Sequence, residues 1–229
     1  MSGRFITFEG GEGAGKSTQI ARLARRLEAR GLEVVTTREP GGSERAERIR
    51  AALLAGGAKP LGSLAEALLF SAARHDHLEA KIRPALARGA FVLSDRFADS
   101  TRAYQGGGGE GALDPKLVAG LERLVVDATK PDLTLILDVP VKIGLARAAA
   151  RRQSKAEDAD RFEAEDMRFH ERLREAFLAI AREEPGRCIV IDASAGPDAV
   201  EERVWAAVEA RFAEDLAATA PAQKRANGS

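Results

Sequence analysis

Short hydrophobic runs alternate with longer, more polar segments along nearly the whole chain. Each run is continuously apolar instead of alternating with polar residues, which is typical of strands covered on both faces of a sheet. Five such runs are present, at residues 5–8, 34–37, 90–94, 133–137 and 189–191. Because strands that alternate with helices are joined by right-handed crossovers, the pattern predicts an α/β fold with a five-stranded parallel sheet flanked by helices.

The segments between these runs are rich in Ala, Leu and Arg and predict helices. Residues 17–30 form one such segment, which ends at Gly31, and residues 65–88 form another, which ends at Gly89. Glycine commonly follows the last residue of a helix, so both glycines indicate helix ends. Pro84 lies inside the second segment, where we expect its ring and missing N–H to kink or break the helix.

Three segments interrupt this alternation. Residues 106–111 are rich in glycine and predict a surface loop, whereas residues 151–161 are strongly charged and predict a mobile flap. Residues 217–229 are rich in Ala, Pro and polar residues, and we expect a disordered tail there. The chain is therefore predicted to form a single domain over residues 1–216, with a small lid at about residues 147–162.

Composition narrows the class of protein. The 229 residues are 45% hydrophobic, enough to bury a core without disulfides or a structural metal. Thirty-five basic residues balance thirty-five acidic ones, which argues against a nucleic-acid or membrane surface. The single cysteine, Cys188, lies in an apolar run and predicts an inert, buried thiol. No segment resembles a signal peptide or reaches the ~20 apolar residues of a membrane span, so we expect a cytoplasmic protein.

Residues 10–17 read Gly-Gly-Glu-Gly-Ala-Gly-Lys-Ser and match the phosphate-binding pattern G-x-x-x-x-G-K-[ST] between a predicted strand and a predicted helix. In that setting glycines let backbone N–H groups surround phosphate oxygens, and the helix N-terminus adds partial positive charge. We expect Lys16 to reach the β- and γ-phosphates and Ser17 to ligate Mg²⁺. The predicted nucleoside triphosphate site consists of Gly10, Gly11, Glu12, Gly13, Ala14, Gly15, Lys16, Ser17 and Thr18.

An acid, Asp95, ends the third predicted strand. Ligands bind at the carboxyl ends of strands in sheets of this kind, so Asp95 is a candidate for acting on Mg²⁺ directly or through water. An ordinary strand-end or helix-cap aspartate is the alternative interpretation.

A phosphate loop alone does not define a reaction. A GTPase switch needs an Asn-Lys-x-Asp motif, but the only asparagine is Asn227, near the end of the chain. A motor or ABC-type ATPase would normally need a longer chain or a coupling partner. A small kinase instead needs an acceptor pocket and a cover that excludes water, and the charged segment at residues 151–161 suits such a cover.

Arginines of the predicted lid are candidates for catalytic charge. Arg147 and Arg151 are four residues apart, so a helix would place both on one face, pointing the same way, and Arg161 follows at the far end of the lid. Guanidinium groups aimed at the transferred phosphoryl group would stabilise its developing charge. A solvated helix face is an equally good interpretation of these arginines taken alone.

A phosphate acceptor is already ionised and needs no general base, so the chemistry calls for arginines and Mg²⁺. The histidines fit this expectation, because none has a clear metal-ligand companion in the sequence. We interpret them as residues of helix surfaces or of packing: His75, His77 and His170.

Seven stretches occur together in a fixed order: residues 8–18 (FEGGEGAGKST), 37–42 (TREPGG), 69–74 (LFSAAR), 94–97 (SDRF), 100–106 (STRAYQG), 132–139 (DLTLILDV) and 160–163 (DRFE). By these stretches the chain resembles the thymidylate kinase family from Arg4 to about Trp205. The resemblance implies a P-loop nucleoside monophosphate kinase fold, ATP and Mg²⁺ as cofactors, phosphorylation of dTMP to dTDP, and a homodimer.

The resemblance also implies how the acceptor base and sugar are bound. Phe70 corresponds to the ring that stacks on thymine, and Arg74 corresponds to the hydrogen-bond partner of a base carbonyl. Thr101 and Gln105 match positions that line the base, and Tyr104 matches an aromatic residue that crowds the sugar. Core packing is the alternative for Phe70 and Tyr104, and solvent exposure is the alternative for Arg74.

The acceptor phosphate and 3′-hydroxyl have implied partners as well. Arg38, Arg50 and Arg96 match or approximate the set that grips the 5′-phosphate, with Arg50 the least certain in alignment. Glu12 is placed as in family members whose loop acid contacts the sugar 3′-hydroxyl. A local ion pair within its own turn is the alternative for Arg38.

Thymidylate kinases have one form with an arginine inside the P-loop and a bacterial form with catalytic basic residues in the lid. This P-loop carries Glu12 and no arginine, so the resemblance implies the bacterial form. Alanines fill positions 148–150, where relatives often have a further arginine, and Arg152 and Lys155 are alternative candidates. The implied catalytic residues are Lys16, Arg96, Arg147, Arg151 and Arg161.

Two rival classes of protein remain open at this point. One is another small P-loop kinase, acting on deoxynucleosides or on a different monophosphate, and a comparison of such acceptors would separate it. The other is a non-catalytic ATP-binding module whose lid docks a partner protein. The presence of Lys16, Ser17 and Asp95 argues against the second class.

Overall fold

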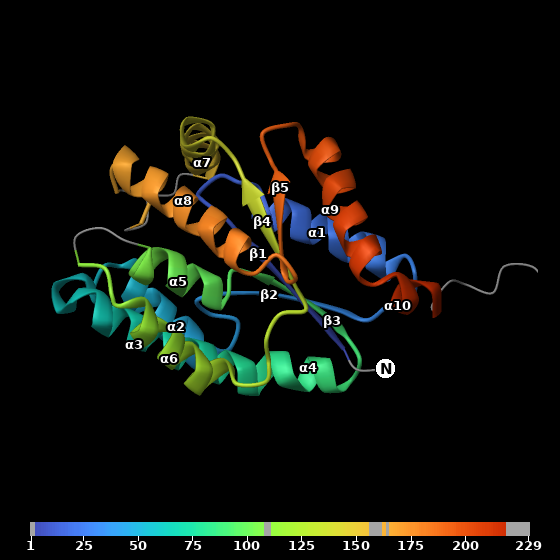
Figure 1. Ribbon diagram of the computed structural model, residues 1–229, viewed down its shortest axis with the longest axis horizontal. Coiled ribbons are helices and arrows are strands. Elements are labelled where there is room, and N and C mark those ends of the chain that lie inside the picture. The colour runs from blue at the N-terminus through green and yellow to red at the C-terminus, as the bar shows by residue number, and fades with distance from the viewer. Residues whose placement is uncertain (1–2, 108–110, 156–161, 164, 219–229) are drawn as a thin grey trace, which may run out of the picture.

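The computed structural model describes residues 3–107, 111–155, 162–163 and 165–218. Within them, five strands form one parallel sheet in the order β2-β3-β1-β4-β5 (Figure 1). The strands are β1 (Arg4–Glu9), β2 (Val34–Arg38), β3 (Phe91–Asp95), β4 (Leu133–Asp138) and β5 (Cys188–Asp192). The predicted five-stranded parallel sheet is confirmed, and every predicted run overlaps one of these strands.

Helices flank the sheet on both faces (Figure 1). In chain order they are α1 (Lys16–Glu28), α2 (Glu44–Leu54), the 3₁₀ turn η1 (Lys59–Leu61), α3 (Gly62–His77), the π turn η2 (Leu78–Ile82), α4 (Arg83–Ala87), α5 (Ala98–Gly106), α6 (Pro115–Val126), α7 (Val141–Lys155), α8 (Met167–Glu183), α9 (Pro197–Arg211) and α10 (Ala213–Ala218). α7 reaches Lys155, so the first part of the predicted flap is helical. α10 reaches Ala218, two residues beyond the predicted domain end. Residues 108–110, 156–161 and 219–229, on which parts of the predicted loop, flap and tail fall, lie outside the described residues.

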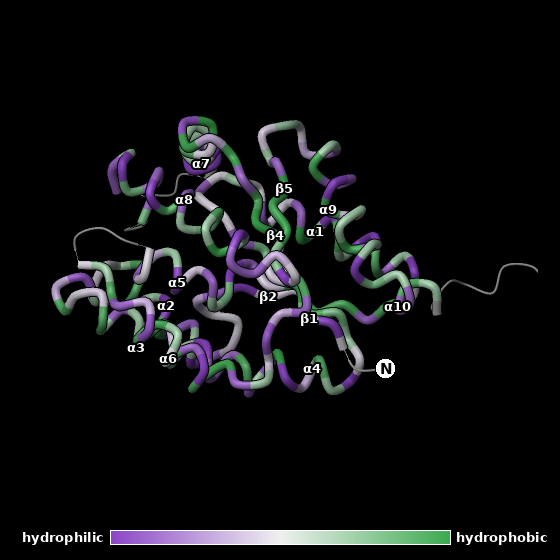
Figure 2. Tube along the Cα trace, viewed as in Figure 1, coloured by the Kyte–Doolittle hydropathy of each residue, from purple (hydrophilic) through white to green (hydrophobic). Residues whose placement is uncertain are grey.

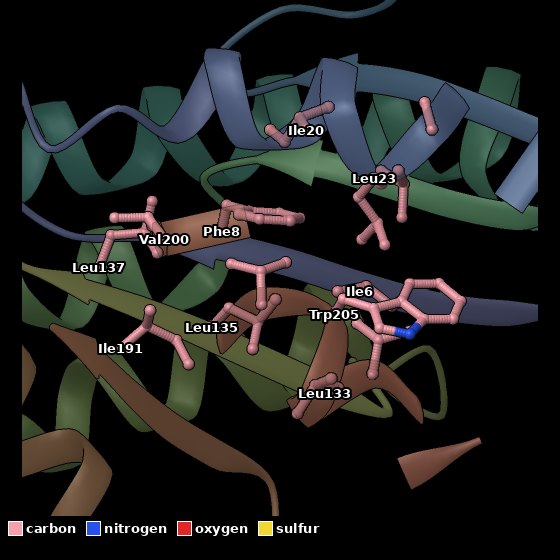
Figure 3. Close-up of a cluster of buried hydrophobic side chains, with 14 of the residues drawn as sticks. Ile6, Phe8, Ile20, Leu23, Leu133, Leu135, Leu137, Ile191, Val200 and Trp205 are labelled. Carbon is pink, nitrogen blue, oxygen red and sulfur yellow. The ribbon is translucent and has the colours of Figure 1, made fainter. Parts of the chain in front are cut away.

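The larger apolar core lies between one face of the sheet and the helices α1 and α9. Strand residues such as Ile6 and Leu135 meet Leu23 of α1 and Trp205 of α9 there (Figure 3). The opposite face is covered by η2, α4, α5 and α8, whose buried side chains form two smaller clusters with the strands. Figure 2 shows hydrophobic residues along the central strands, as expected for strands covered on both faces.

The predicted helix at residues 65–88 is observed as α3, η2 and α4 in unbroken succession. The π turn η2 ends at Ile82, two residues before Pro84. In a regular α-helix the proline ring would collide with the carbonyl group four residues earlier, and a wider turn relieves that collision. Pro84 was expected to kink or break the helix. It is instead preceded by a π turn, and the helical segment continues past Pro84.

The position of β1 at the centre of the sheet determines where a ligand can bind. Phe8 of β1 is paired with Asp95 of β3 on one side and with Leu135 of β4 on the other. The carboxyl ends of these three strands therefore meet at one edge, and the P-loop leaves β1 at that edge.

Among the described residues, no single helix has both the length and the apolar composition that a membrane span requires. The bent pair formed by residues 44–54 and 59–87 meets these criteria only when its two arms are taken together.

Candidate active site

The P-loop connects the end of β1 to the start of α1. Gly15 is the N-cap of α1 and has φ +92°, a left-handed conformation that suits glycine. Lys16 follows, and its Nζ donates hydrogen bonds to the carbonyl oxygens of Gly10 (3.2 Å) and Gly11 (3.0 Å). Burial lowers the pKa of Lys16, and the neighbouring Arg96 adds to that effect. The loop thus presents the N-terminus of α1 and one buried amino group to a phosphate.

Ser17 and Asp95 lie together at the same edge of the sheet. The Ser17 hydroxyl donates a 2.6 Å hydrogen bond to Oδ2 of Asp95, so the two predicted metal ligands are adjacent. Both offer hard oxygen atoms, which suit Mg²⁺. In the described part of the chain, no group of three or more His, Cys, Asp or Glu side chains is arranged to hold a metal. Mg²⁺ at this position would therefore need phosphate and water oxygens as further ligands.

Glu12 projects from the P-loop into a cluster of polar groups. Its Oε1 accepts hydrogen bonds from Arg96 (2.7 Å) and from the Tyr104 hydroxyl (3.1 Å). Burial alone would raise the pKa of Glu12, but the charges of Arg96 and Lys16 outweigh it and hold that pKa at about 2. Glu12 is therefore an anion that fixes Arg96 and Tyr104 beside the P-loop.

Arg96 occupies a turn that Glu9 holds in place. Its backbone has φ +72°, which is unusual for a residue with a side chain and marks a constrained turn between β3 and α5. The Glu9 carboxylate accepts hydrogen bonds from the Phe97 N–H (2.7 Å) and the Ser100 hydroxyl (2.6 Å). Burial, reinforced by the charge of Asp99, raises the pKa of Glu9 to about 7. The motif at residues 8–18 contains Glu9, but sequence reasoning assigned it no role.

Arg74 of α3 lies in a buried charged cluster. Its Nε donates a 2.8 Å hydrogen bond to Glu39, and its Nη2 donates a 3.0 Å hydrogen bond to the Thr101 hydroxyl. His77 completes the cluster with hydrogen bonds to Glu39 (3.1 Å) and to Thr37 (2.7 Å). Arg74 is 4% exposed, so the alternative of a solvated arginine is wrong. Sequence reasoning missed Glu39, although it lies in the motif at residues 37–42.

Aromatic side chains gather beside Phe70. The rings of Phe70 and Phe162 have centroids 6.2 Å apart, and Tyr104 lies edge-on to Phe162 at 5.2 Å. Gln105 is buried next to Glu66, and its Oε1 has no hydrogen-bond partner among the described residues. Phe162 lies in the motif at residues 160–163 and was not assigned a role from the sequence.

Arg38, at the end of β2, and Arg50, in α2, both have partners close by in the sequence. Arg38 lies 3.2 Å from Glu47 of α2, which is outside the Glu-Pro-Gly-Gly turn, so this ion pair is not the pair within its own turn that was the alternative. Arg50 donates a 2.7 Å hydrogen bond to the carbonyl oxygen of Pro40. More than half of the Arg38 side chain remains exposed, which leaves its guanidinium accessible to an anion.

The arginines of α7 have different hydrogen-bond partners, although Arg147 and Arg151 line the same cavity. Arg147 donates hydrogen bonds to carbonyl oxygens of the loop after β5, including that of Ala193 at 2.9 Å. Arg151 and Arg152 both donate to the carboxylate of Glu163, each at 2.6 Å. A spacing of four residues places two side chains on one helix face, but their tertiary partners decide their direction. The predicted catalytic residue Arg161 lies outside the described residues.

One cavity of about 1190 Å³ collects most of these residues. It is lined by P-loop residues 12–18, by Asp95 and by the arginines 147 and 151. Its lining also includes every residue predicted to bind the acceptor: Glu12, Arg38, Arg50, Phe70, Arg74, Arg96, Thr101, Tyr104 and Gln105. Gly10 and Gly11, the first two residues of the P-loop, are outside this lining and line a separate small cavity. The volume exceeds that of a usual small-molecule pocket and suits two nucleotides side by side.

The fold and this cavity define a P-loop phosphotransferase with an acceptor site beside its phosphate loop. Comparison with known proteins specifies the family. The family profile described as thymidylate kinase matches residues 8–204. The chain belongs to the thymidylate kinase family, whose members phosphorylate dTMP with ATP.

Individual relatives agree with this assignment. A thymidylate kinase from a Bradyrhizobium strain is 58% identical over 216 residues, which cover 94% of this chain and 94% of that protein. A thymidylate kinase from Rhodopseudomonas palustris is 59% identical over 221 residues, covering 96% and 94%. The crystal structure of thymidylate kinase from Ehrlichia chaffeensis superposes with a TM-score of 0.72 at 37% identity, covering 91% of this chain and 99% of that one.

Proposed function

We propose a role for each residue of this site in the transfer of the γ-phosphoryl group from ATP to dTMP. The observation that carries the proposal is the single cavity that P-loop residues share with Phe70 and Arg74. Phosphoryl transfer between two anions requires alignment and charge stabilisation more than acid–base chemistry. A cavity that joins a phosphate loop to a base-sized aromatic site meets that requirement.

The P-loop binds the triphosphate of ATP. The backbone at the N-terminus of α1 surrounds the phosphates, and Lys16 moves from its carbonyl partners on the loop to the β- and γ-phosphates. Ser17 and Asp95 would hold Mg²⁺, whose chemical contribution is to neutralise charge on the phosphates. The 2.6 Å hydrogen bond between Ser17 and Asp95 keeps their oxygens together before the nucleotide binds.

The acceptor dTMP occupies the part of the cavity lined by Phe70. Thymine stacks on that ring, while Arg74 donates a hydrogen bond to a base carbonyl from its buried position. Thr101 and Gln105 line the base, and the unpartnered Oε1 of Gln105 suits the N–H of a pyrimidine base once the side chain adjusts. Tyr104 crowds the sugar and disfavours a 2′-hydroxyl.

The acceptor phosphate lies between the acceptor base and the P-loop. Arg96 is well placed to grip it, because the guanidinium already bridges Glu12 and the carbonyl oxygen of Gly10 (3.1 Å). Arg38 and Arg50 complete the group of positive charges on the other side. Glu12 is then available to the sugar 3′-hydroxyl as a hydrogen-bond acceptor.

The lid residues divide into two groups. Arg151 and Arg152, together with Arg161, supply positive charge to the phosphoryl group in transit. Arg147 instead serves the donor side, because its guanidinium is held by the loop after β5 that lines the cavity next to the P-loop. Arg147 is therefore proposed to contact ATP rather than the transferred group.

A homodimer is proposed through the face formed by α3 and α6, which lie side by side (Figure 1). Large apolar side chains are exposed on this face: Leu61 and Leu124 are 69% and 79% exposed, and Leu64, Leu68 and Leu117 are between 43% and 49% exposed. Exposed apolar residues mark protein–protein contacts where they form one patch. A second copy of the chain would cover them.

One acceptor panel tests the proposed substrate. ATP consumption is measured in a coupled assay with dTMP, UMP, CMP, AMP, GMP and thymidine as acceptors, at equal concentrations. We expect the highest kcat/KM with dTMP. Equal or better activity with another monophosphate would overturn the dTMP assignment and leave the kinase class intact, while activity with thymidine alone would favour a nucleoside kinase.

A further inference from the structure

The first turn of α7 lies directly against the backbone of the P-loop. A Cβ atom added to Gly144 would lie 2.4 Å from the carbonyl oxygen of Glu12, and a Cβ atom added to Gly13 would lie 1.9 Å from the carbonyl oxygen of Gly144. Contacts this short do not occur with real Cβ atoms. The obstacles are backbone atoms, which cannot rotate away as a flexible side chain would. Two glycines facing each other therefore permit an approach that no other pair of residues allows.

This contact fixes α7 relative to the phosphate-binding backbone. The P-loop, β4, α7 and α8 together enclose a cavity of only about 20 Å³, to which α7 contributes Val141 and Leu145. A space of that size holds about one water molecule, so the helix has no room to approach further. Further along α7, Arg147 is tied to the loop after β5. Two separate contacts thus hold this helix on the nucleotide-binding body.

The contact matters because α7 carries the arginines of the lid. Arg151 is seven residues beyond Gly144, a distance of about 10 Å along the helix axis. A rigid helix transmits any displacement at its first turn to the guanidinium groups further along. The distance between the P-loop and these guanidiniums is thus set at Gly144.

We propose that Gly144 is a positioning residue, which sets the separation between the P-loop and the arginines of α7. The inference rests on the proposed role of Arg151 in phosphoryl transfer. It adds that α7, as far as Arg151, belongs to the fixed body of the enzyme rather than to its moving cover.

The substitution Gly144→Ala tests this inference. To reach ordinary contact at 3.4 Å, the new methyl group must move away from the Glu12 carbonyl by about 1 Å, and displacements of that size can lower turnover about 100-fold. We expect kcat to fall about 10- to 100-fold and KM for dTMP to change less than kcat, because the base-binding residues Phe70 and Arg74 lie on α3, away from Gly144, whereas Glu12 moves with the P-loop. The matched control is Gly120→Ala in α6, where the nearest atom to the new Cβ is a side-chain nitrogen of Arg123 at 3.8 Å. An unchanged kcat in Gly144→Ala would overturn the inference without affecting the proposed function.

A double-mutant cycle distinguishes positioning from general damage to the fold. If Gly144 acts through Arg151, then Gly144→Ala should cost less than about 2-fold in kcat when introduced into Arg151→Ala. Full additivity of the two losses would overturn the inference. A normal kcat in Arg151→Ala alone would instead refute the proposed catalytic role of Arg151, and the inference that depends on it.

Hydrogen exchange of the unaltered chain provides a test that does not depend on the folding of a variant. The amides of residues 145–151 should be equally protected in the free enzyme and with a non-hydrolysable ATP analogue plus dTMP. Protection that appears only with both nucleotides, by about 10-fold or more, would identify α7 as part of the moving cover and overturn the inference.

Discussion

The buried carboxyl group of Glu9 predicts an unusual dependence of stability on pH. Glu9 is fully buried at the end of β1, next to the turn that carries Arg96. Burial and the charge of Asp99 raise its pKa from 4.5 to about 7, although Arg96 and the hydrogen bond from Ser100 oppose the change. In the unfolded chain the same group regains its ordinary pKa.

The sign of the effect follows from proton binding. Between about pH 4.5 and pH 7, the folded chain holds a proton on Glu9 that the unfolded chain has lost, so the free energy of unfolding decreases as the pH rises. Below this window both states are protonated and the stabilisation is complete; above it the stabilisation is gone. The interval from 4.5 to about 7, at about 1.4 kcal/mol for each pH unit, corresponds to about 3 kcal/mol.

The substitution Glu9→Gln removes the titrating group and keeps its shape. The amide oxygen of Gln can still accept from the Phe97 N–H, and its NH₂ group can donate to the Ser100 oxygen. Urea unfolding at about pH 4.5 and about pH 8 gives the free energy of unfolding of each protein. Across this range the original chain should lose about 3 kcal/mol more than Glu9→Gln, while the control Glu28→Gln, at an exposed position of α1, should follow the original chain. An equal loss of unfolding free energy between these two pH values in Glu9→Gln and in the original chain would refute the reasoning.

Three further predictions concern the phosphate loop, the acceptor site and the apolar face. Lys16→Met should lower kcat at least about 100-fold in a single-turnover assay, because it removes the buried cation of the loop, and retained turnover would exclude that role. Arg74→Met should cost roughly 3–5 kcal/mol in urea unfolding by leaving Glu39 buried without its arginine, and Arg74→Met combined with Glu39→Gln should recover much of this loss. If Arg74→Met costs less than about 1 kcal/mol, the pair is not a structural ion pair. Leu64→Asp with Leu68→Asp should convert a dimer to a monomer in light scattering, and a monomeric original chain would refute the proposed dimer.

The sheet was predictable because its signal is local and repeated. Each strand is a short run of apolar residues between segments of helical composition, and this pattern alone favours a parallel sheet. The π turn before Pro84 could not be predicted, because a proline inside a helical pattern can be accommodated by a break, a kink or a π turn. Which of these occurs depends on how Leu78 and Ile82 pack in the core, and sequence spacing does not contain that information.

The sequence predicted which residues belong to the candidate site better than it predicted which of them are hydrogen-bonded to each other. Sequence motifs predicted the P-loop, Phe70 and the arginines as parts of the site, and the structure places them around one cavity. The partners of those arginines come from distant parts of the chain: Arg74 meets Glu39, 35 residues earlier. Glu9 and Glu39 lie inside the motifs at residues 8–18 and 37–42, but their buried partners come from other parts of the chain, which the sequence does not show. Glu9 had a signal, because it ends a buried apolar run, whereas Glu39 follows Arg38 at the end of the partly exposed strand β2 and had none of this kind.

Cys188, at the start of β5, gives the chain a practical property. It is the single cysteine of the sequence, it is 5% exposed, and burial raises its pKa to about 12. At neutral pH about one such thiol in 10⁵ is ionised, and the thiolate is the form that reacts with maleimides. A cysteine introduced at an exposed position of α7 would therefore take up a fluorescent or spin label selectively. The unaltered chain is already a suitable background for site-specific labelling, with no native residue to remove.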